Sequence, residues 1–324
     1  MRIGPEVRPR VLLSQCLELR ACRYDGQCLH DPVMAVLLPW IDPLPVCPEE
    51  AVGLGTPRDP LRLVRHPDGD HMVQPSTGID VTPDMVRFSH TFLNGLREID
   101  GVVLKSRSPS CGIRDTKIFP GKESSSILGR GAGLFAREVK RVFPGIPLED
   151  EQRLHQAAIR DHFFTALFTR ARLRQARSQA CRSALADFHH RHRLLFLTAN
   201  QRRTHRLDRL VAPEESRSPA AVFRDYDREL AGVFARRPRL QSQCNTLELA
   251  FRSVSKRLSR EEVRRFREEW IKVSRGTQPV TGLRRQLASW LDRYDVSDLR
   301  DQVYFRPYPR ELEALPATGE GMNA

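Results

Sequence analysis

Gly101-Val102-Val103-Leu104-Lys105, which leads into the loop Ser106–Gly112, decides the fold of the first half of this 324-residue chain. A short apolar run of this kind is typical of a strand buried on both faces of a parallel sheet. Val11-Leu12-Leu13-Ser14 has the same character and predicts a second buried strand. Because candidate helices alternate with these runs, we expect an α/β N-terminal domain with a mostly parallel sheet and flanking helices.

Three further segments complete the expectation for this half. Met85–Leu96 is predicted to be a helix, since apolar residues recur at helical spacing and Thr82 and Pro83 form a typical helix start. Gly129–Val142 is predicted to be another helix. The apolar segment Val33–Trp40 is expected to end before a rigid loop, because prolines follow at positions 43, 45 and 48.

The composition of the chain changes near Glu149. Residues 149–324 carry 34 Lys and Arg against 23 Asp and Glu, a net charge of +11, whereas residues 1–148 carry a net charge of +2. Strand signals are nearly absent after this point, so we expect domains at 1–148 and 149–324, the second all-α. Its predicted helices are Glu151–Arg174, Ser183–Leu210, Pro219–Arg236, Thr246–Arg257, Arg260–Ser274 and Gly282–Tyr294.

The charge of the second half predicts a polyanionic partner, and RNA is the expected one. The densest basic segment supplies the RNA-binding candidates Arg191, Arg193, Arg202, Arg203, Arg206 and Arg209. An inert solvated face is the alternative for such a segment. His189 and His192 in the same segment fit a structural or RNA-facing role better than a metal site. No apolar run follows Met1 or reaches the length of a membrane helix, so we expect a cytoplasmic protein.

Seven cysteines in a cytoplasmic chain indicate metal, cluster or redox chemistry rather than a disulfide framework. Cys16, Cys47 and Cys111 lie in loops that follow candidate strands or stand among prolines. Such loops converge at the carboxyl ends of parallel strands. Three thiolates suit a 4Fe–4S cluster with one iron left open to substrate. Cys22 is a possible fourth ligand, and a zinc site or three inert buried cysteines would also fit the pattern.

Several motifs in the first half resemble those of the TudS-like thiouracil and thiouridine desulfidases. They are Ser14-Gln15-Cys16, Arg23-Tyr24-Asp25-Gly26, Pro45-Val46-Cys47-Pro48-Glu49, Thr56-Pro57-Arg58 and Leu104-Lys105-Ser106-Arg107-Ser108-Pro109-Ser110-Cys111-Gly112. The resemblance implies that Cys16, Cys47 and Cys111 bind a 4Fe–4S cluster and that Glu49 and Ser108 act in catalysis. Gln15, Leu17-Glu18-Leu19 and Glu50-Ala51-Val52-Gly53 depart from the family pattern in the loops, which affects the expected substrate more than the cluster.

The second half, from about Leu154 to Leu312, resembles the YbgA-like helical domain. Matching segments are Phe188-His189-x-x-His192-Arg193-x-Leu195, Lys256-x-Leu258-Ser259, Arg275-Gly276 and Tyr304-x-x-Pro307-Tyr308-Pro309-x-Glu311-Leu312. The fusion implies a desulfidase that converts 4-thiouridine in tRNA to uridine. The alternatives are a desulfidase of free thiouracil or thiouridine nucleotides and a non-catalytic RNA-binding redox sensor. Asp25 and Arg58 are expected either to pair with each other or to serve as ordinary turn residues, which we favour for Asp25.

Overall fold

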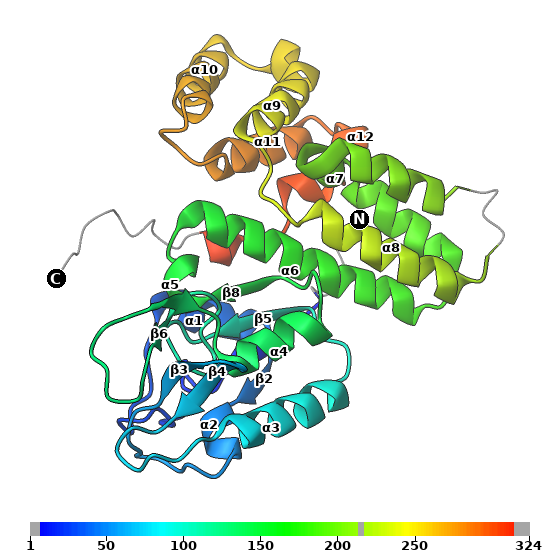
Figure 1. Ribbon diagram of the computed structural model, residues 1–324. Helices are drawn as coiled ribbons and strands as arrows, with labels where there is room; N and C mark the ends of the chain where they lie inside the picture. Colours follow the sequence, from blue (N-terminus) through cyan, green and yellow to red (C-terminus); the bar gives the residue numbers. More distant parts are fainter. Residues whose placement is uncertain (1–6, 213–216, 314–324) are drawn as a thin grey trace. The chain divides into compact units, whose positions relative to one another are not determined.

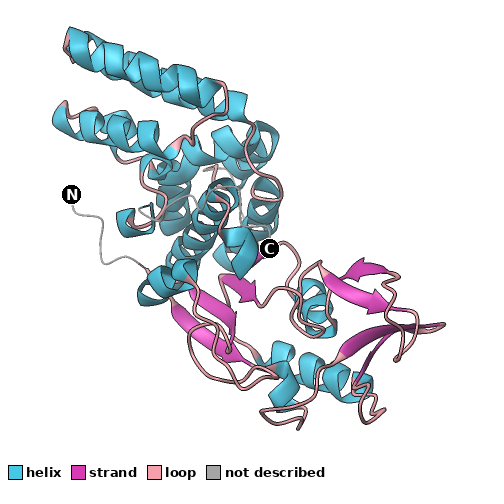
Figure 2. Cartoon of the chain, turned by 90° about the vertical axis from the view of Figure 1, so that its left-hand side faces the viewer, coloured by secondary structure: helices cyan, strands magenta, loops and turns pink. Residues whose placement is uncertain are grey.

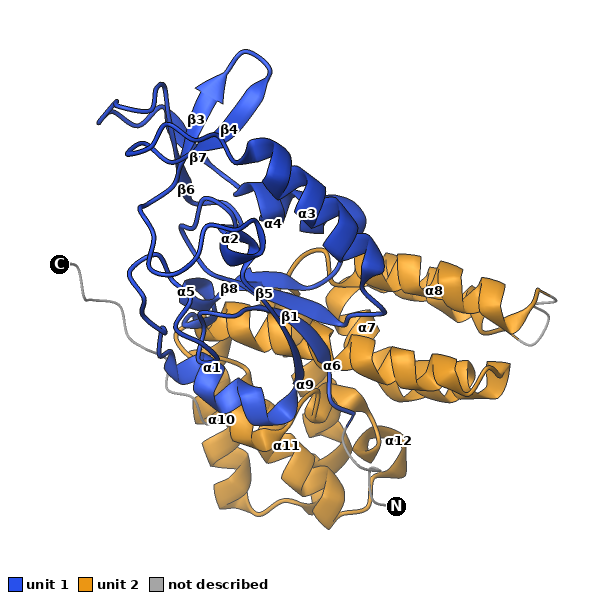
Figure 3. Ribbon diagram, turned by 90° about the horizontal axis from the view of Figure 1, so that it is seen from below, with its two compact units in different colours: residues 1–156, 315–324 blue, residues 157–314 orange. Residues whose placement is uncertain are grey.

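The computed structural model describes residues 7–212 and 217–313. These residues form two compact units, one within Met1–Gln156 and one within Ala157–Ala314 (Figure 3). The boundary expected at residues 148 and 149 falls inside a strand of the first unit, because Leu148–Asp150 pairs with Gly101–Leu104. Each unit is considered separately below.

A four-stranded parallel sheet forms the centre of the first unit, which confirms the predicted fold class (Figure 1). Its order is β2-β1-β5-β8, with β1 at Arg10–Ser14, β2 at Asp42–Val46, β5 at Gly101–Leu104 and β8 at Leu148–Asp150. The apolar side chains of β1 and β5 are fully buried, as expected for inner strands covered on both faces. This burial makes the inner strands the rigid part of the unit.

The expectation of a rigid loop after Trp40 was wrong, because Asp42–Val46 is a strand despite its two prolines. β2 lies at the edge of the sheet, where proline is tolerated. The residues that alternate with Pro43 and Pro45 direct their peptide groups toward β1. The two positions at which proline lacks an N–H group therefore face the open edge of the sheet. The register places Val46 opposite Ser14, so that both strands end together.

A second sheet, β4-β3-β6-β7, was not predicted from the sequence. Its strands are β3 (Arg62–His66), β4 (Gly69–Val73), β6 (Thr116–Phe119) and β7 (Gly129–Gly131). β7 occupies the start of the segment predicted to be a helix at Gly129–Val142, and α4 (Leu134–Val142) begins only at Leu134. Glycine is a poor helix former, which explains why the three-residue segment Gly129–Gly131 pairs with β6 instead.

The remaining helices of the first unit are short except for α3. They are α1 (Pro32–Leu37), α2 (Pro48–Ala51), α3 (Thr82–Gly95) and α5 (Glu151–Leu154). The helix predicted at Met85–Leu96 is confirmed as part of α3, and it starts with Thr82 and Pro83 in the first turn. Phe88 and Phe92 of α3 pack against Phe135 of α4, which joins the two helices.

The second unit contains helices and no strand within its described residues, as predicted (Figure 2). Its α-helices are α6 (Ala157–Ser178), α7 (Arg182–Leu210), α8 (Pro219–Val233), α9 (Leu240–Val254), α10 (Arg260–Ser274), α11 (Thr281–Arg293) and α12 (Ser297–Arg300). The helix expected at Glu151–Arg174 is divided into α5 and α6, and α7 bends at Asn200, whose backbone is extended. Within the ranges described, no helix combines the length and apolar character needed to span a membrane.

Candidate active site

The candidate ligands Cys16, Cys47 and Cys111 meet at the carboxyl ends of β1, β2 and β5. Cys16 follows β1 by two residues, and Cys47 follows β2 directly as the N-cap of α2. Cys111 lies in the loop after β5, and β5 is a neighbour of β1 in the sheet. All three line a cavity of about 540 Å³ in the first unit. Adjacent parallel strands therefore assemble the set from three distant segments.

The loop Ser106–Gly112 has a fixed backbone. The Cys111 N–H donates to Ser108 Oγ at 3.1 Å, and Thr116 Oγ1 donates to the Ser108 carbonyl at 2.8 Å. A Cβ at Gly112 would lie 2.1 Å from Thr116 Oγ1 and 2.8 Å from the Ser108 carbonyl oxygen, so this position requires glycine. At the start of the loop, the buried carboxylate of Glu151 accepts from Ser106 N–H at 2.8 Å. Cys111 is thus held in one place.

The environment of the thiols favours their neutral form when no metal is bound. Burial raises the pKa of the Cys111 thiol to about 12. A hydrogen bond with Cys16 raises the pKa of the Cys22 thiol to about 12, and contact with Cys22 together with burial raises that of Cys47. Ligand atoms of Cys22, Cys47 and Glu50 lie within 4.8 Å of one another. Cys22, which the sequence left open as a ligand, therefore belongs to the same group of thiols.

A concentration of buried and partly buried thiols around one cavity fits a thiophilic metal group. Metal binding releases the thiol protons, and soft sulfur ligands favour iron–sulfur clusters, zinc or copper(I) over magnesium or calcium. Three different loops supply the thiols of Cys16, Cys47 and Cys111. Ligands from three loops suit a metal group that is larger than a single ion. The donor chemistry of the cavity accordingly accommodates the iron–sulfur cluster expected from the sequence.

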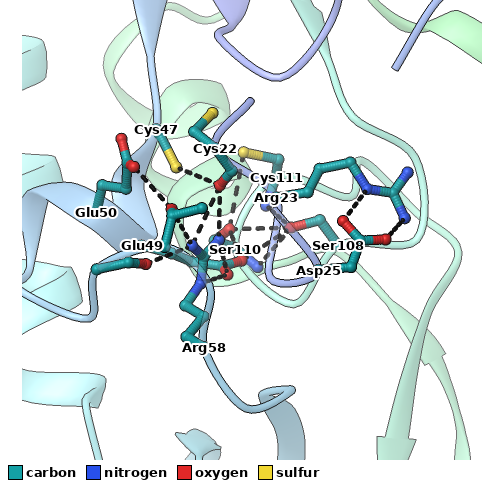
Figure 4. A network of polar contacts seen from close by, with 12 residues as sticks. Cys22, Arg23, Asp25, Cys47, Glu49, Glu50, Arg58, Ser108, Ser110 and Cys111 are labelled. Atoms are coloured by element: carbon teal, nitrogen blue, oxygen red, sulfur yellow. Dashed lines mark hydrogen bonds and ion pairs between the residues drawn. The ribbon is translucent and has the colours of Figure 1, made fainter. Parts of the chain in front are cut away.

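Glu49 lies at the centre of a polar network beside these thiols (Figure 4). Ser110 Oγ donates to Glu49 Oε1 at 2.7 Å, and Ser108 Oγ donates to the same oxygen at 3.3 Å. The other oxygen, Oε2, accepts from Arg58 Nε at 2.9 Å and forms an ion pair with Arg58 Nη2 at 2.7 Å. Glu49 is 8% exposed, and the guanidinium compensates its charge. Glu49 and Ser108, predicted from the resemblance, are thus in direct contact.

Two members of this network were not identified from the sequence. Ser110 belongs to the motif that contains Cys111 and lies two residues from Ser108. This position in the motif was the signal that could have identified it as a site residue. Arg58 was expected to pair with Asp25 or to be a turn residue, and both expectations were wrong. Asp25 pairs with Arg23 at 3.1 Å, whereas Arg58 binds Glu49 and donates to the Cys22 carbonyl at 3.1 Å. Arg58 therefore connects the carboxylate to the cysteine loop.

The rim of the cavity is basic and partly aromatic. Arg23, Arg62, Lys117 and Arg130 all contribute to its lining. Tyr24 also lines it and is 44% exposed, with the guanidinium of Arg23 lying 5.7 Å from its ring centroid. Cationic side chains bind phosphate, and an exposed aromatic ring offers a stacking surface for a base. These basic and aromatic side chains share the cavity with the thiols.

The arginines predicted to bind RNA lie on α7 and differ in their surroundings. Arg193 pairs with Asp208 at 2.9 Å, and Arg203 pairs with Glu229 at 2.7 Å. Arg206 lies 3.5 Å from the same Glu229, and Arg191 lies 3.8 Å from Asp187. Arg202 and Arg209 have no ion pair within the described residues. These two offer the least compensated charge of the set.

Two of the histidines of α7, His189 and His192, are structural. His189 is buried, and its ring nitrogens lie 2.8 Å from Tyr226 Oη and 2.9 Å from Asp208 Oδ1. His192 is buried between Phe188 and Phe196, whose rings stack on it. Burial lowers the pKa of His192 well below the usual value. Both rings therefore serve the packing of the helices, in agreement with the structural role expected from the sequence.

Residues 11–151 match the family described as 2-thiouracil desulfurase. A curated relative, the uncharacterized protein YbbK of Bacillus subtilis (strain 168), is 30% identical over 109 residues, which cover 32% of this chain and 72% of YbbK. The chain belongs to the 2-thiouracil desulfurase family. Membership of this family supports a desulfidase, an enzyme that removes sulfur from a thiolated compound.

Residues 193–309 match a second family, described as a protein of unknown function, DUF1722. The fusion expected from the sequence is therefore present. A solved structure, the [4Fe-4S]-dependent thiouracil desulfidase TudS, shares 30% sequence identity with a TM-score of 0.36, and the match covers 45% of this chain and 93% of TudS. The family assignment rests on sequence, and the site described above lies within the segment matched by the desulfurase family.

Replacing Arg58 with methionine is expected to lower the free energy of unfolding by about 3 kcal/mol, because the buried Glu49 carboxylate would lose its counter-charge. Chemical denaturation of the metal-free protein measures this change. In the double variant Arg58→Met, Glu49→Gln, part of the stability should return, since no buried charge remains. Equal losses in the single and double variants would show that the ion pair is not the cause.

Replacing Cys22 with alanine tests the open question of a fourth ligand. We expect the variant to retain iron and sulfide at the level of the parent protein, because Cys16, Cys47 and Cys111 suffice in our account. Metal and sulfide analysis after anaerobic reconstitution provides the measurement, with Cys47→Ala as the comparison that should lose both. Loss of iron in Cys22→Ala would identify Cys22 as a ligand.

Proposed function

We propose that this protein is a desulfidase that converts 4-thiouridine in tRNA to uridine, using a 4Fe–4S cluster held by Cys16, Cys47 and Cys111. The observation that carries the proposal is the meeting of these three thiols with Glu49 and Ser108 in one cavity. The family match, which spans the whole of this site, supports the desulfidase activity.

The reaction exchanges sulfur for oxygen without net oxidation or reduction. Water adds its oxygen to C4 of the pyrimidine, the C–S bond breaks, and uridine and hydrogen sulfide are the products. A cluster held by three thiolates supplies an iron that can act as a Lewis acid toward soft sulfur. The residues of the chain must bind the base, exclude bulk water and move the protons.

Glu49 is placed to accept a proton from the attacking water. Its carboxylate lies in the lining of the cavity, where Arg58 and Ser110 fix its position. Ser108 Oγ contacts Glu49 Oε1 and is fixed by the Cys111 N–H, so it can orient the water or the edge of the base. The same carboxylate can return the proton to the departing sulfur.

The proposal of tRNA as the substrate rests on charge and composition. The helical half carries the net charge of +11 described above, most of it arginine, which binds phosphate through two parallel hydrogen bonds. The basic rim of the cavity, including Lys117 and Arg130, suits the phosphates beside a target nucleotide. A nucleotide within tRNA must leave its stack to enter a cavity of this kind.

Replacing both Arg202 and Arg209 with glutamate tests the role of the helical half. We expect desulfuration of tRNA to fall about tenfold at physiological salt, because two phosphate contacts become repulsive. Turnover of free 4-thiouridine should be unchanged. The initial rates of both reactions, measured with the holoenzyme, provide the comparison.

The matched control replaces Arg260 and Arg275, which are exposed and carry the same charge, with glutamate. This variant should keep most of the activity toward tRNA, since its charges lie outside α7. Equal rates for tRNA in Arg202→Glu, Arg209→Glu and the parent protein would contradict an RNA-binding role for α7.

A desulfidase of free thiouracil or its nucleotides is the second candidate. One observation favours it: among the described residues, those that line the cavity around the cysteines all belong to the first unit. On this hypothesis the small compounds are turned over at least as efficiently as tRNA. Comparison of kcat/KM for 4-thiouridine and for thiolated tRNA separates the two candidates.

A further inference from the structure

The hairpin formed by β3 and β4 brings two histidines together in the first unit (Figure 3). In the register of this hairpin, His66 lies opposite Gly69, and Val64 lies opposite His71. Residues that are diagonal to each other on one face of an antiparallel pair are within reach of long side chains. The rings of His66 and His71 accordingly lie with their centroids 4.3 Å apart.

The turn of the hairpin adds a carboxylate to the two imidazoles. Asp68 lies in this turn, and each of its carboxylate oxygens lies 3.1 Å from His71 Nε2. Ligand atoms of His66, Asp68 and His71 all lie within 4.8 Å of one another. Zinc bonds to nitrogen and oxygen are about 2.0–2.2 Å long, so the ligand atoms of one ion lie roughly 3.5 Å apart. Because His66 and Asp68 are exposed, rotation of these two side chains can close the remaining distance.

A fourth residue, Asp80, orients the ring of His71. His71 Nδ1 lies 2.6 Å from Asp80 Oδ2, and the other oxygen of Asp80 accepts from Thr82 N–H at 2.8 Å. The backbone around Asp80 is fixed to β4, because Val81 N–H donates to the Met72 carbonyl at 2.9 Å. Histidines that bind metals commonly donate their other ring N–H to a carboxylate in this way. Nε2 is therefore the nitrogen of His71 that is directed at a ligand.

The contacts of His71 favour a cation at Nε2. A carboxylate oxygen only accepts, so Nδ1 carries the proton that it donates to Asp80. The same rule applies to Nε2 and Asp68, so either a second proton or a metal ion lies between them. Among the described residues, neither Asp68 nor Asp80 forms an ion pair with lysine or arginine. The charge of the two carboxylates therefore matches a divalent cation.

We propose that His66, Asp68 and His71 bind a divalent transition-metal ion of the zinc class. Asp80 would act on this site only through His71 Nδ1, as a positioning residue. Imidazole and carboxylate ligands suit zinc, and water can complete the coordination because the hairpin turn is exposed. The ion would tie this turn to the segment that leads into α3. None of these four residues lines the cysteine cavity, so the site is separate from the cluster and from the proposed desulfidase reaction.

Equilibrium dialysis of the tag-free, cluster-loaded protein against Zn²⁺, followed by metal analysis, measures zinc separately from iron. We expect the parent protein to bind about one zinc ion per chain at this site. Asp80→Asn should weaken the binding about 10–100-fold, the usual effect of losing a partner that orients a ligand. His66→Gln should weaken it by more than about 100-fold, because it removes a ligand itself. This substitution is at an exposed position and should leave the fold intact.

His90→Gln is the matched control. His90 is exposed on α3 and does not belong to the group of ligands. The control should bind zinc as tightly as the parent protein does. Iron content should be the same in all the variants, since none of the substitutions touches the cysteine cavity.

X-ray absorption at the zinc edge identifies the ligands. We expect nitrogen and oxygen neighbours at about 2.0–2.2 Å and no sulfur neighbour at about 2.3 Å. Sulfur neighbours would place the zinc at the cysteines and overturn the proposal. Absence of zinc binding by the parent protein, or equal affinity in the parent and His66→Gln, would overturn it as well. Asp80→Asn that binds as tightly as the parent would contradict the positioning role of Asp80.

Discussion

Replacing Cys111 with alanine is expected to abolish iron–sulfur binding and desulfuration together. Cys111 is 5% exposed, and the Ser108 hydroxyl and the tight Gly112 turn fix its position. No described cysteine other than Cys16, Cys22, Cys47 and Cys111 lines the cavity. Iron and sulfide per protein after anaerobic reconstitution, together with the rate of desulfuration, are the measurements.

Cys244→Ala is the matched control for this substitution. Cys244 is buried to the same degree, 4% exposed, but it belongs to the helical unit and lies away from the cavity lining. The control should keep its iron and its activity while losing some stability. Cys111→Ala protein that retains a full complement of iron would show that the assignment of ligands is wrong.

Replacing Glu49 with glutamine is expected to reduce kcat by a factor of about 10²–10⁴, the usual contribution of a general base. An amide keeps the size of the side chain and can still contact Ser110, but it cannot accept a proton from water. Because Glu49 is not among the proposed thiolate ligands, iron and sulfide content should be unchanged. Steady-state rates at saturating substrate isolate the effect on kcat.

Glu138→Gln is the control for loss of a carboxylate. Glu138 pairs with Arg141 on the surface of α4 and has no contact with the cavity. Its rate should match that of the parent protein. A Glu49→Gln enzyme with nearly unchanged kcat would remove Glu49 from proton transfer and leave it a purely structural partner of Arg58.

Much of the fold could be predicted because its strongest patterns are local. The fully apolar runs of β1 and β5 could belong only to buried strands, and α10 was predicted at its observed bounds, Arg260–Ser274. A capping box at Ser259 and Glu262 fixes the start of α10, and such a cap is visible in the sequence.

The unpredicted elements depend on neighbours in space rather than on their own residues. β2 contains two prolines and forms a strand only because it lies at the sheet edge beside β1. β7 is three residues long and is defined by pairing with β6. The bend of α7 at Asn200 is an exception with a local cause, because the Asn200 side chain accepts a hydrogen bond from the Arg203 N–H at 3.1 Å, as a helix N-cap does.

The candidate site shows the same division. Cys16, Cys47, Cys111, Glu49 and Ser108 were identified from motifs, and the structure brings them to one cavity. The roles of Ser110 and Arg58 depend on their contacts with Glu49. In the sequence Ser110 lies 61 residues from Glu49, and Arg58 lies 9 residues from it.

The central claim is tested most directly by incubating the anaerobically reconstituted protein with tRNA that contains 4-thiouridine. The nucleosides are then quantified by mass spectrometry and the released sulfide by a colorimetric assay. The account predicts that 4-thiouridine is replaced by an equal amount of uridine with matching sulfide, and only when the protein carries its iron–sulfur cluster. Unchanged 4-thiouridine in both tRNA and the free nucleoside, with the cluster intact, would contradict the account.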